Sequence, residues 1–96
     1  MAVVKVDIKL SVTFLREGKK FIAYSPALDL STSGKSLKEA KKRFEEASTL
    51  FIEELNKKGT TTEVLKELGW TVGDRRLTPP VIVGHDTQAV RVPVMA

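Results

Sequence analysis

Apolar and polar residues alternate along the first part of the chain. From Val4 to Phe14 every even position is apolar, and every odd position between them is charged or hydroxylated. Such alternation places the apolar side chains on one face of an extended strand. A turn at Arg16–Lys19 then leads into a strand at Phe21–Tyr24, which we expect to pair with the first as a hairpin. Pro26 has no N–H to donate and ends this ladder, and Leu28–Ser33 is predicted as a short third strand.

A helical period replaces the alternation after Gly34. Ser36 and Glu39 have the spacing of a capping box, which predicts the start of a helix. Gly59 suits the left-handed position just beyond its end. Leu50 widens an apolar stripe of about five turns. The stripe consists of Leu37, Ala40, Phe44, Ala47, Phe51 and Leu55.

The chain beyond this helix contains shorter elements. A second capping box at Thr60–Glu63 predicts a short helix that Gly69 ends. The region that follows is rich in turn residues and contains two short apolar stretches, Val81–Val83 and Val90–Val94. Because Pro93 fits only an edge strand, we expect the second stretch at a sheet edge or in a partner's sheet.

These elements predict an α+β fold with the order β-β-β-α-α-β. One helix, from Leu37 to about Lys57, is expected across one face of an antiparallel sheet of three or four strands. The chain is expected to form a single domain over residues 1–96, with its core in 3–69, a strand-like extension in 70–96 and no DNA-binding domain. The expected core residues are Val4, Val6, Ile8, Leu10, Val12, Phe14, Phe44, Ala47 and Phe51.

Such a sheet leaves edges that small proteins usually cover. The apolar alternating stretch Val90–Val94 has little chain left to bury it. We therefore expect a homodimer in which the C-terminal strands contribute to the interface.

Composition excludes several classes of chemistry. The 96 residues include no cysteine and one histidine, which removes disulfides, thiolate catalysis and cysteine-based zinc sites. No apolar run approaches the roughly 18 residues of a membrane-spanning helix, and the N-terminus lacks a secretory pattern. A cytoplasmic protein without a membrane partner is expected. The net charge of +4 is compatible with RNA or an acidic partner.

We find no convergent catalytic set. The pairs Glu45-Glu46 and Glu53-Glu54 are adjacent on the predicted helix, so the members of each pair diverge by about 100°. His85 beside Asp86 is interpreted as a surface-loop histidine. We expect neither enzymatic activity nor a cofactor or metal site.

Gly34-Lys35-Ser36 is similar to the end of a phosphate-binding loop. That loop needs a glycine five residues before Gly34, and this position is Asp29. A turn glycine followed by a helix cap is the favoured interpretation.

Basic residues crowd the start of the predicted helix. Positive charge there opposes the helix macrodipole, although Lys41–Glu45 and Lys42–Glu46 have the spacing of ion pairs. Two interpretations stay open: a solvated charged face, or contact with RNA or an acidic partner surface. No aromatic residue interleaves the cluster, so base stacking has no support. The candidate nucleic-acid contacts are Lys35, Lys38, Lys41, Lys42 and Arg43.

The segments Phe21–Leu30 and Ser33–Ala40 resemble the HicB family of toxin–antitoxin antitoxins. The shared pattern is an aromatic strand, an alanine, a Pro-x-Leu element, a short strand, Gly-x-Ser/Thr and a Glu-Ala pair that opens a helix. Glu46-Ala47 matches a second acidic-alanine pair in that helix. The resemblance covers residues 4–58 and implies a partial double-stranded-RNA-binding-like fold.

The resemblance also implies a function. Members of the family typically bind a small RNA-cleaving toxin, HicA, and block its activity. Many add a C-terminal DNA-binding domain, which the turn-rich remainder after Gly69 does not predict. The alternative is a solitary family member that acts as an RNA-binding or dimeric accessory protein. Trp70 is expected to pack in the core, with recognition as the other possibility. The candidate partner-binding residues are Tyr24, Asp29, Ser31, Trp70 and Arg91.

Overall fold

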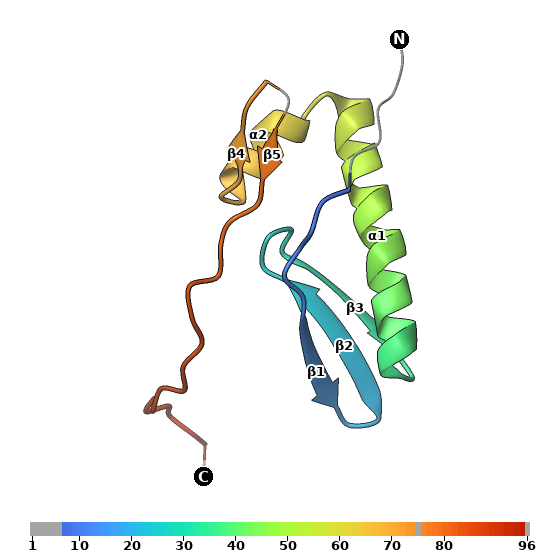
Figure 1. Cartoon of the computed structure of the whole chain (residues 1–96). Coiled ribbons are helices and arrows are strands. Elements are labelled where there is room, and N and C mark those ends of the chain that lie inside the picture. Colours follow the sequence, from blue (N-terminus) through green and yellow to red (C-terminus); the bar gives the residue numbers. More distant parts are fainter. Residues whose placement is uncertain (1–6, 75, 96) are drawn as a thin grey trace.

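The computed structural model describes residues 7–74 and 76–95 (Figure 1). It has the predicted α+β class: a three-stranded antiparallel sheet, a long and a short helix, and a small two-stranded sheet. Strand β2 is central in the larger sheet, and α1 packs on one of its faces. The elements are β1 (Thr13–Glu17), β2 (Lys20–Ser25), β3 (Leu30–Gly34), α1 (Leu37–Lys58), α2 (Thr61–Glu67), β4 (Thr71–Val72) and β5 (Leu77–Thr78).

The β1–β2 hairpin turns at Gly18, as predicted. Gly18 has φ 62°, the left-handed conformation that favours glycine at the first position of a two-residue hairpin turn. Glu17 and Lys20 face each other across this turn. Strand β2 ends at Ser25, directly before Pro26, again as predicted.

The first strand was expected over Val4–Phe14, and its position is wrong. Residues 4–6 lie outside the described part of the chain, residues 7–12 form no ladder, and β1 begins at Thr13. Thr13 pairs with Tyr24. Because Pro26 comes directly after Ser25, the last residue of β2, that strand does not continue far enough to pair with the residues before Thr13.

The predicted alternation nevertheless decides which side chains face inward in residues 7–12. Ile8, Leu10 and Val12 are half-buried against the core, and the residues between them are exposed. Side-chain packing thus keeps this segment extended although its backbone has no partner strand.

The long helix α1 begins and ends where the sequence predicts. The Ser36 hydroxyl accepts a hydrogen bond from the Glu39 N–H at 3.1 Å, and Gly59 takes the left-handed conformation after the last turn. The Glu39 carboxylate pairs with Arg43 at 2.9 Å, in place of the reciprocal contact of a capping box. The second predicted box is also wrong, because Thr60 has φ −111° and ψ 9° and makes no side-chain cap. An N-cap needs an extended backbone to direct its hydroxyl at the helix.

Two clusters of buried side chains hold the helices against the sheet. Around Phe44, Ala23 and Ala40 allow α1 to approach β2 closely. The second cluster joins the turn after β2 to α2 and consists of Ala27, Leu28, Leu65 and Trp70.

The predicted core is only partly correct. Phe44 is buried, with 6% of its surface exposed, whereas Phe51 and Ala47 are half-buried. Val4 and Val6 lie outside the described residues. Phe14 is 39% exposed because β1 is an edge strand with no neighbour on its outer side. Leu50, placed at the margin of the apolar stripe, is 64% exposed on the outer surface of α1.

Gly34 is not the predicted turn glycine. It is the buried last residue of β3, paired with Phe21. A Cβ atom here would lie 2.7 Å from the Ala40 backbone nitrogen. Glycine is therefore required by the close approach of β3 to the first turn of α1.

The C-terminal part differs from its prediction as well. A short hairpin, β4–β5, supplies the final strands, and Val81–Val83 and Val90–Val94 lie in a segment without helix or strand. Figure 1 shows this segment leaving the body of the molecule, which reaches 60 Å in its longest dimension. The radius of gyration is 16.4 Å, compared with about 13 Å for a compact chain of 100 residues.

Candidate functional site

The three-stranded sheet has one covered and one uncovered face. Ala23 faces α1, so its neighbours Ile22 and Tyr24 face the opposite side. Within the described residues no helix or strand packs on that side. We call it the open face. Strand register assigns to it Thr13, Leu15, Glu17, Lys20, Ile22, Tyr24, Ser31 and Ser33.

Three of the candidate partner-binding residues meet at one end of the open face. Tyr24 on β2 lies opposite Ser31 on β3. The Tyr24 hydroxyl donates a hydrogen bond to Asp29 Oδ1 at 3.0 Å. Asp29 has φ 48°, an uncommon conformation for a residue other than glycine, and its N–H bonds the Pro26 carbonyl at 3.3 Å. The turn after β2 thus directs a carboxylate back toward the tyrosine.

This geometry raises the pKa of Tyr24 above its usual value near 10, through the hydrogen bond to Asp29, then burial, then the aspartate charge. Any stabilisation from this contact is present below pH 10 and is lost as the pH rises through the raised pKa. Tyr24 is the single tyrosine of the chain, so tyrosinate absorbance reports it alone. We expect Asp29→Gly, which tolerates the positive φ, to return the pKa toward 10. Asp86→Gly is the matched control, and an equal shift in both variants would contradict the contact.

The other two candidates behave differently. Trp70 is 5% exposed, and its indole Nε1–H donates to the Ala27 carbonyl at 2.7 Å. Trp70 therefore packs in the core as expected, in the second core cluster, and its prediction as a candidate partner contact is wrong because the side chain is buried there. Arg91 is exposed in the C-terminal segment, outside any helix or strand.

The five residues of the basic cluster do not form one continuous surface. Lys41 lies 5.3 Å from the ring centroid of Phe14 on β1. Arg43 reaches the other way and donates to the Ser33 carbonyl at 2.9 Å while pairing with Glu39. Of the five basic residues, Lys35, Lys38 and Lys42 are exposed and form no ion pair with any described residue.

The outer surface of α1 changes from basic to acidic within one turn. Lys42 shares a shallow hollow with Glu45, Glu46 and Glu53. The predicted Lys41–Glu45 and Lys42–Glu46 pairs are not among the ion pairs of the described residues, which are Glu39–Arg43 and Glu54–Lys58. A polyanion that contacts the basic cluster would meet carboxylates directly beyond it.

Sequence reasoning missed the apolar residues of the open face. Leu15 is 52% exposed, and its cross-strand neighbour Ile22 is half-buried. They are on this face because Ala23 and its partner Phe14 face α1, so the next pair along the ladder, Leu15 and Ile22, points away from it. Continuing the alternation past Phe14 to the turn would have revealed Leu15. Together with Tyr24 they form an apolar strip beside hydroxyl groups, a composition suited to binding protein.

No protein-family model, curated protein or solved structure matches this chain significantly. Residues 7–74 and 76–95 include no group of three metal-ligating side chains placed to hold an ion. Within the same ranges, no helix has both the length and the apolar character to cross a bilayer.

Proposed function

We propose that this protein is a non-catalytic binding protein of the HicB type, which binds a small mRNA-cleaving toxin of the HicA type in the cytoplasm and masks it. The observation that supports this most is the open face, where Leu15 is exposed and Ile22 and Tyr24 are half-buried on the β1–β2 hairpin. The motif that resembles the HicB family runs through β2, β3 and the start of α1. Its Tyr24 lies on the open face, and so does Ser31, which stands between the two segments of the motif.

The physical argument is one of complementarity. Protein interfaces combine an aromatic or apolar centre with a polar rim. On the open face, Leu15, Ile22 and Tyr24 form the apolar strip, with Glu17 and Lys20 at one end and Ser31 beside Tyr24 at the other. A partner bound here would cover side chains that no described helix or strand covers, without disturbing α1.

The test is co-expression with a HicA-like toxin encoded beside this gene. The wild-type protein should restore growth and co-purify with the toxin. Leu15→Glu places a charge in the centre of the interface and should weaken the complex by about 2 kcal/mol or more, roughly thirtyfold. Leu50→Glu introduces the same charge at an exposed leucine on the outer side of α1 and should leave rescue intact.

Two results would contradict the proposal. Failure of the wild-type protein to rescue or co-purify would remove the masking role. Equal activity of the Leu15→Glu and Leu50→Glu variants would remove the open face as the binding surface.

The alternative function is that of an RNA-binding or dimeric accessory domain. Its RNA-binding form is favoured by Lys35, Lys38 and Lys42, which are exposed and form no ion pair within the described ranges. Three phosphate contacts on single-stranded RNA predict a slope of about −2 when log affinity is plotted against log salt concentration. Reversing the charge of Lys35, Lys38 and Lys42 together should abolish such binding. Absence of RNA binding at low salt would eliminate this form and leave a protein partner.

A further inference from the structure

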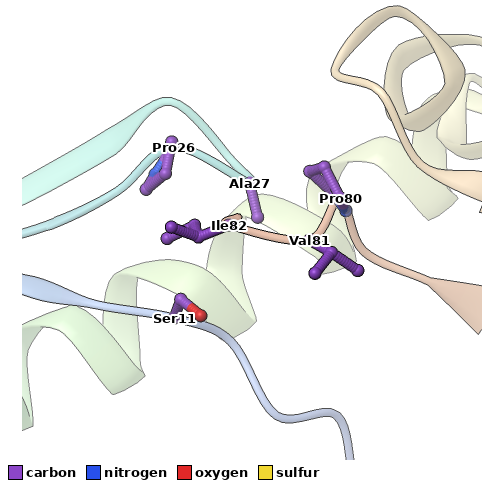
Figure 2. Close-up of a pocket in the computed structure, with 6 residues that line it drawn as sticks. All are labelled: Ser11, Pro26, Ala27, Pro80, Val81 and Ile82. Carbon is purple, nitrogen blue, oxygen red and sulfur yellow. The ribbon is translucent and has the colours of Figure 1, made fainter. Parts of the chain in front are cut away.

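The C-terminal segment, residues 83–95, contains alternate valines whose side chains are exposed to solvent. It begins where the chain leaves a pocket of about 170 Å³ between the turn after β2 and residue Ser11 (Figure 2). Ile82 in this pocket is 36% exposed, whereas Val83 directly after it is 98% exposed. Val90, Val92 and Val94 are each between 63% and 82% exposed.

The chain also has an unpaired strand edge. Residues 7–17, the edge segment, are extended, and among the described residues β1 within it pairs only with β2. In a two-residue hairpin the residues flanking the turn are hydrogen-bonded to each other. Glu17, Leu15 and Thr13 therefore use their backbone groups toward β2. The N–H and C=O groups of Phe14 and Arg16 point outward from the sheet.

We propose that the C-terminal segment pairs with the edge segment of a second copy of this chain, and that the exchange is reciprocal in a two-fold dimer. In an extended strand the backbone groups of alternate residues point to opposite sides. Val90, Val92 and Val94 thus present one complete bonding edge. An antiparallel strand bonded through this edge places their side chains on the same face as Phe14, which is 39% exposed at the margin of the α1 layer.

Pro93 explains why the assembly stops at two chains. It lies between Val92 and Val94, so the N–H that it lacks would have pointed to the opposite side of the strand. Pairing through the valines is unaffected, and a further strand on the far side is blocked. The added strand is a closed edge, as small β proteins require to avoid open-ended association.

A second copy fits better than an unrelated partner or the chain's own edge. The edge segment contains two acidic and two basic residues, and the C-terminal segment contains one of each. Each segment is thus neutral, and the two can pair between copies without charge repulsion despite the net charge of +4. The two segments are similar in length, and each can offer the other a strand to pair with. Within one chain they do not pair, since Figure 1 shows the C-terminal segment apart from β1 and every residue in it is exposed.

The test is the molar mass in solution of purified full-length variants, measured by light scattering over a range of protein concentrations. The wild type should be a dimer at tens of micromolar. Val90→Pro removes an N–H on the bonding edge, twice per dimer, and should raise the dissociation constant roughly a hundredfold. Ala89→Pro removes an N–H on the opposite side and should leave the dimer intact. Val90→Ala keeps the N–H and should fall between the wild type and Val90→Pro.

The helical circular dichroism and the fluorescence of the buried Trp70 show whether each variant has folded. A wild-type monomer would overturn the proposal, and so would a Val90→Pro dimer as stable as the wild type. Equal weakening by Val90→Pro and Ala89→Pro would also overturn it, because the pairing side would then be irrelevant. None of these measurements involves a toxin, so their outcome is independent of the masking function.

Discussion

Replacing Phe44 by alanine should lower the free energy of unfolding by roughly 3–5 kcal/mol. Phe44 is 6% exposed and is the large side chain between α1 and β2, where its buried neighbours are Ala23 and Ala40. Two alanines cannot fill the cavity that its loss creates. The variant therefore loses the transfer free energy of the buried ring and also incurs the cost of the cavity. A domain of this size has a total stability of about 5–15 kcal/mol. Urea unfolding followed by circular dichroism, at a fixed protein concentration, measures the difference.

Leu50→Ala is the matched control on the same helix. Leu50 is 64% exposed, so its truncation should change the free energy of unfolding by no more than about 0.5 kcal/mol. Similar losses in the two variants would show that α1 does not use the Phe44 side to pack on the sheet.

Replacing Trp70 by alanine should be about equally destabilising, at roughly 3–5 kcal/mol. The indole fills the space between the turn after β2 and α2, beside Leu28 and the fully buried Leu65. Its N–H also satisfies the Ala27 carbonyl at 2.7 Å, a bond between residues 43 positions apart in the chain. Urea unfolding followed by circular dichroism is again the measurement, since the variant has no tryptophan fluorescence.

Trp70→Phe separates the hydrogen bond from the packing. Phenylalanine retains most of the apolar contact and leaves the Ala27 carbonyl without its donor, which should cost about 1–3 kcal/mol. If both variants unfolded like the wild type, Trp70 would not be structural, and recognition, the other possibility, would become the better interpretation.

The sequence allowed good prediction of the elements that depend on neighbouring residues. Helix α1 follows from the Ser36 cap, a stripe of apolar residues and the left-handed Gly59, all interactions within a few residues. The end of β2 follows from Pro26, whose missing N–H acts locally. The alternation in residues 7–12 also identified the inward-facing side chains, because that property depends only on strand geometry.

The candidate site was predictable only in part. Tyr24, Asp29 and Ser31 were identified through the family resemblance, and the structure brings them together. Leu15 was missed because the predicted strand stopped at Phe14. The same alternation, continued to the turn, places this odd position on the face away from α1, and the pairing of Leu15 with Ile22 agrees with that.

The sequence by itself determined the fold class, the limits of α1 and the hairpin turn, since propensity, capping and period act over short distances. The tertiary structure alone decided the role of Gly34, which must lack a side chain because the Ala40 backbone approaches it. It also decided that Trp70 is buried, and that Lys41 reaches toward edge strand β1 whereas Arg43 reaches toward edge strand β3. Each of these depends on atoms that are distant in sequence and meet only when α1 and the final hairpin pack, so no local pattern specifies them.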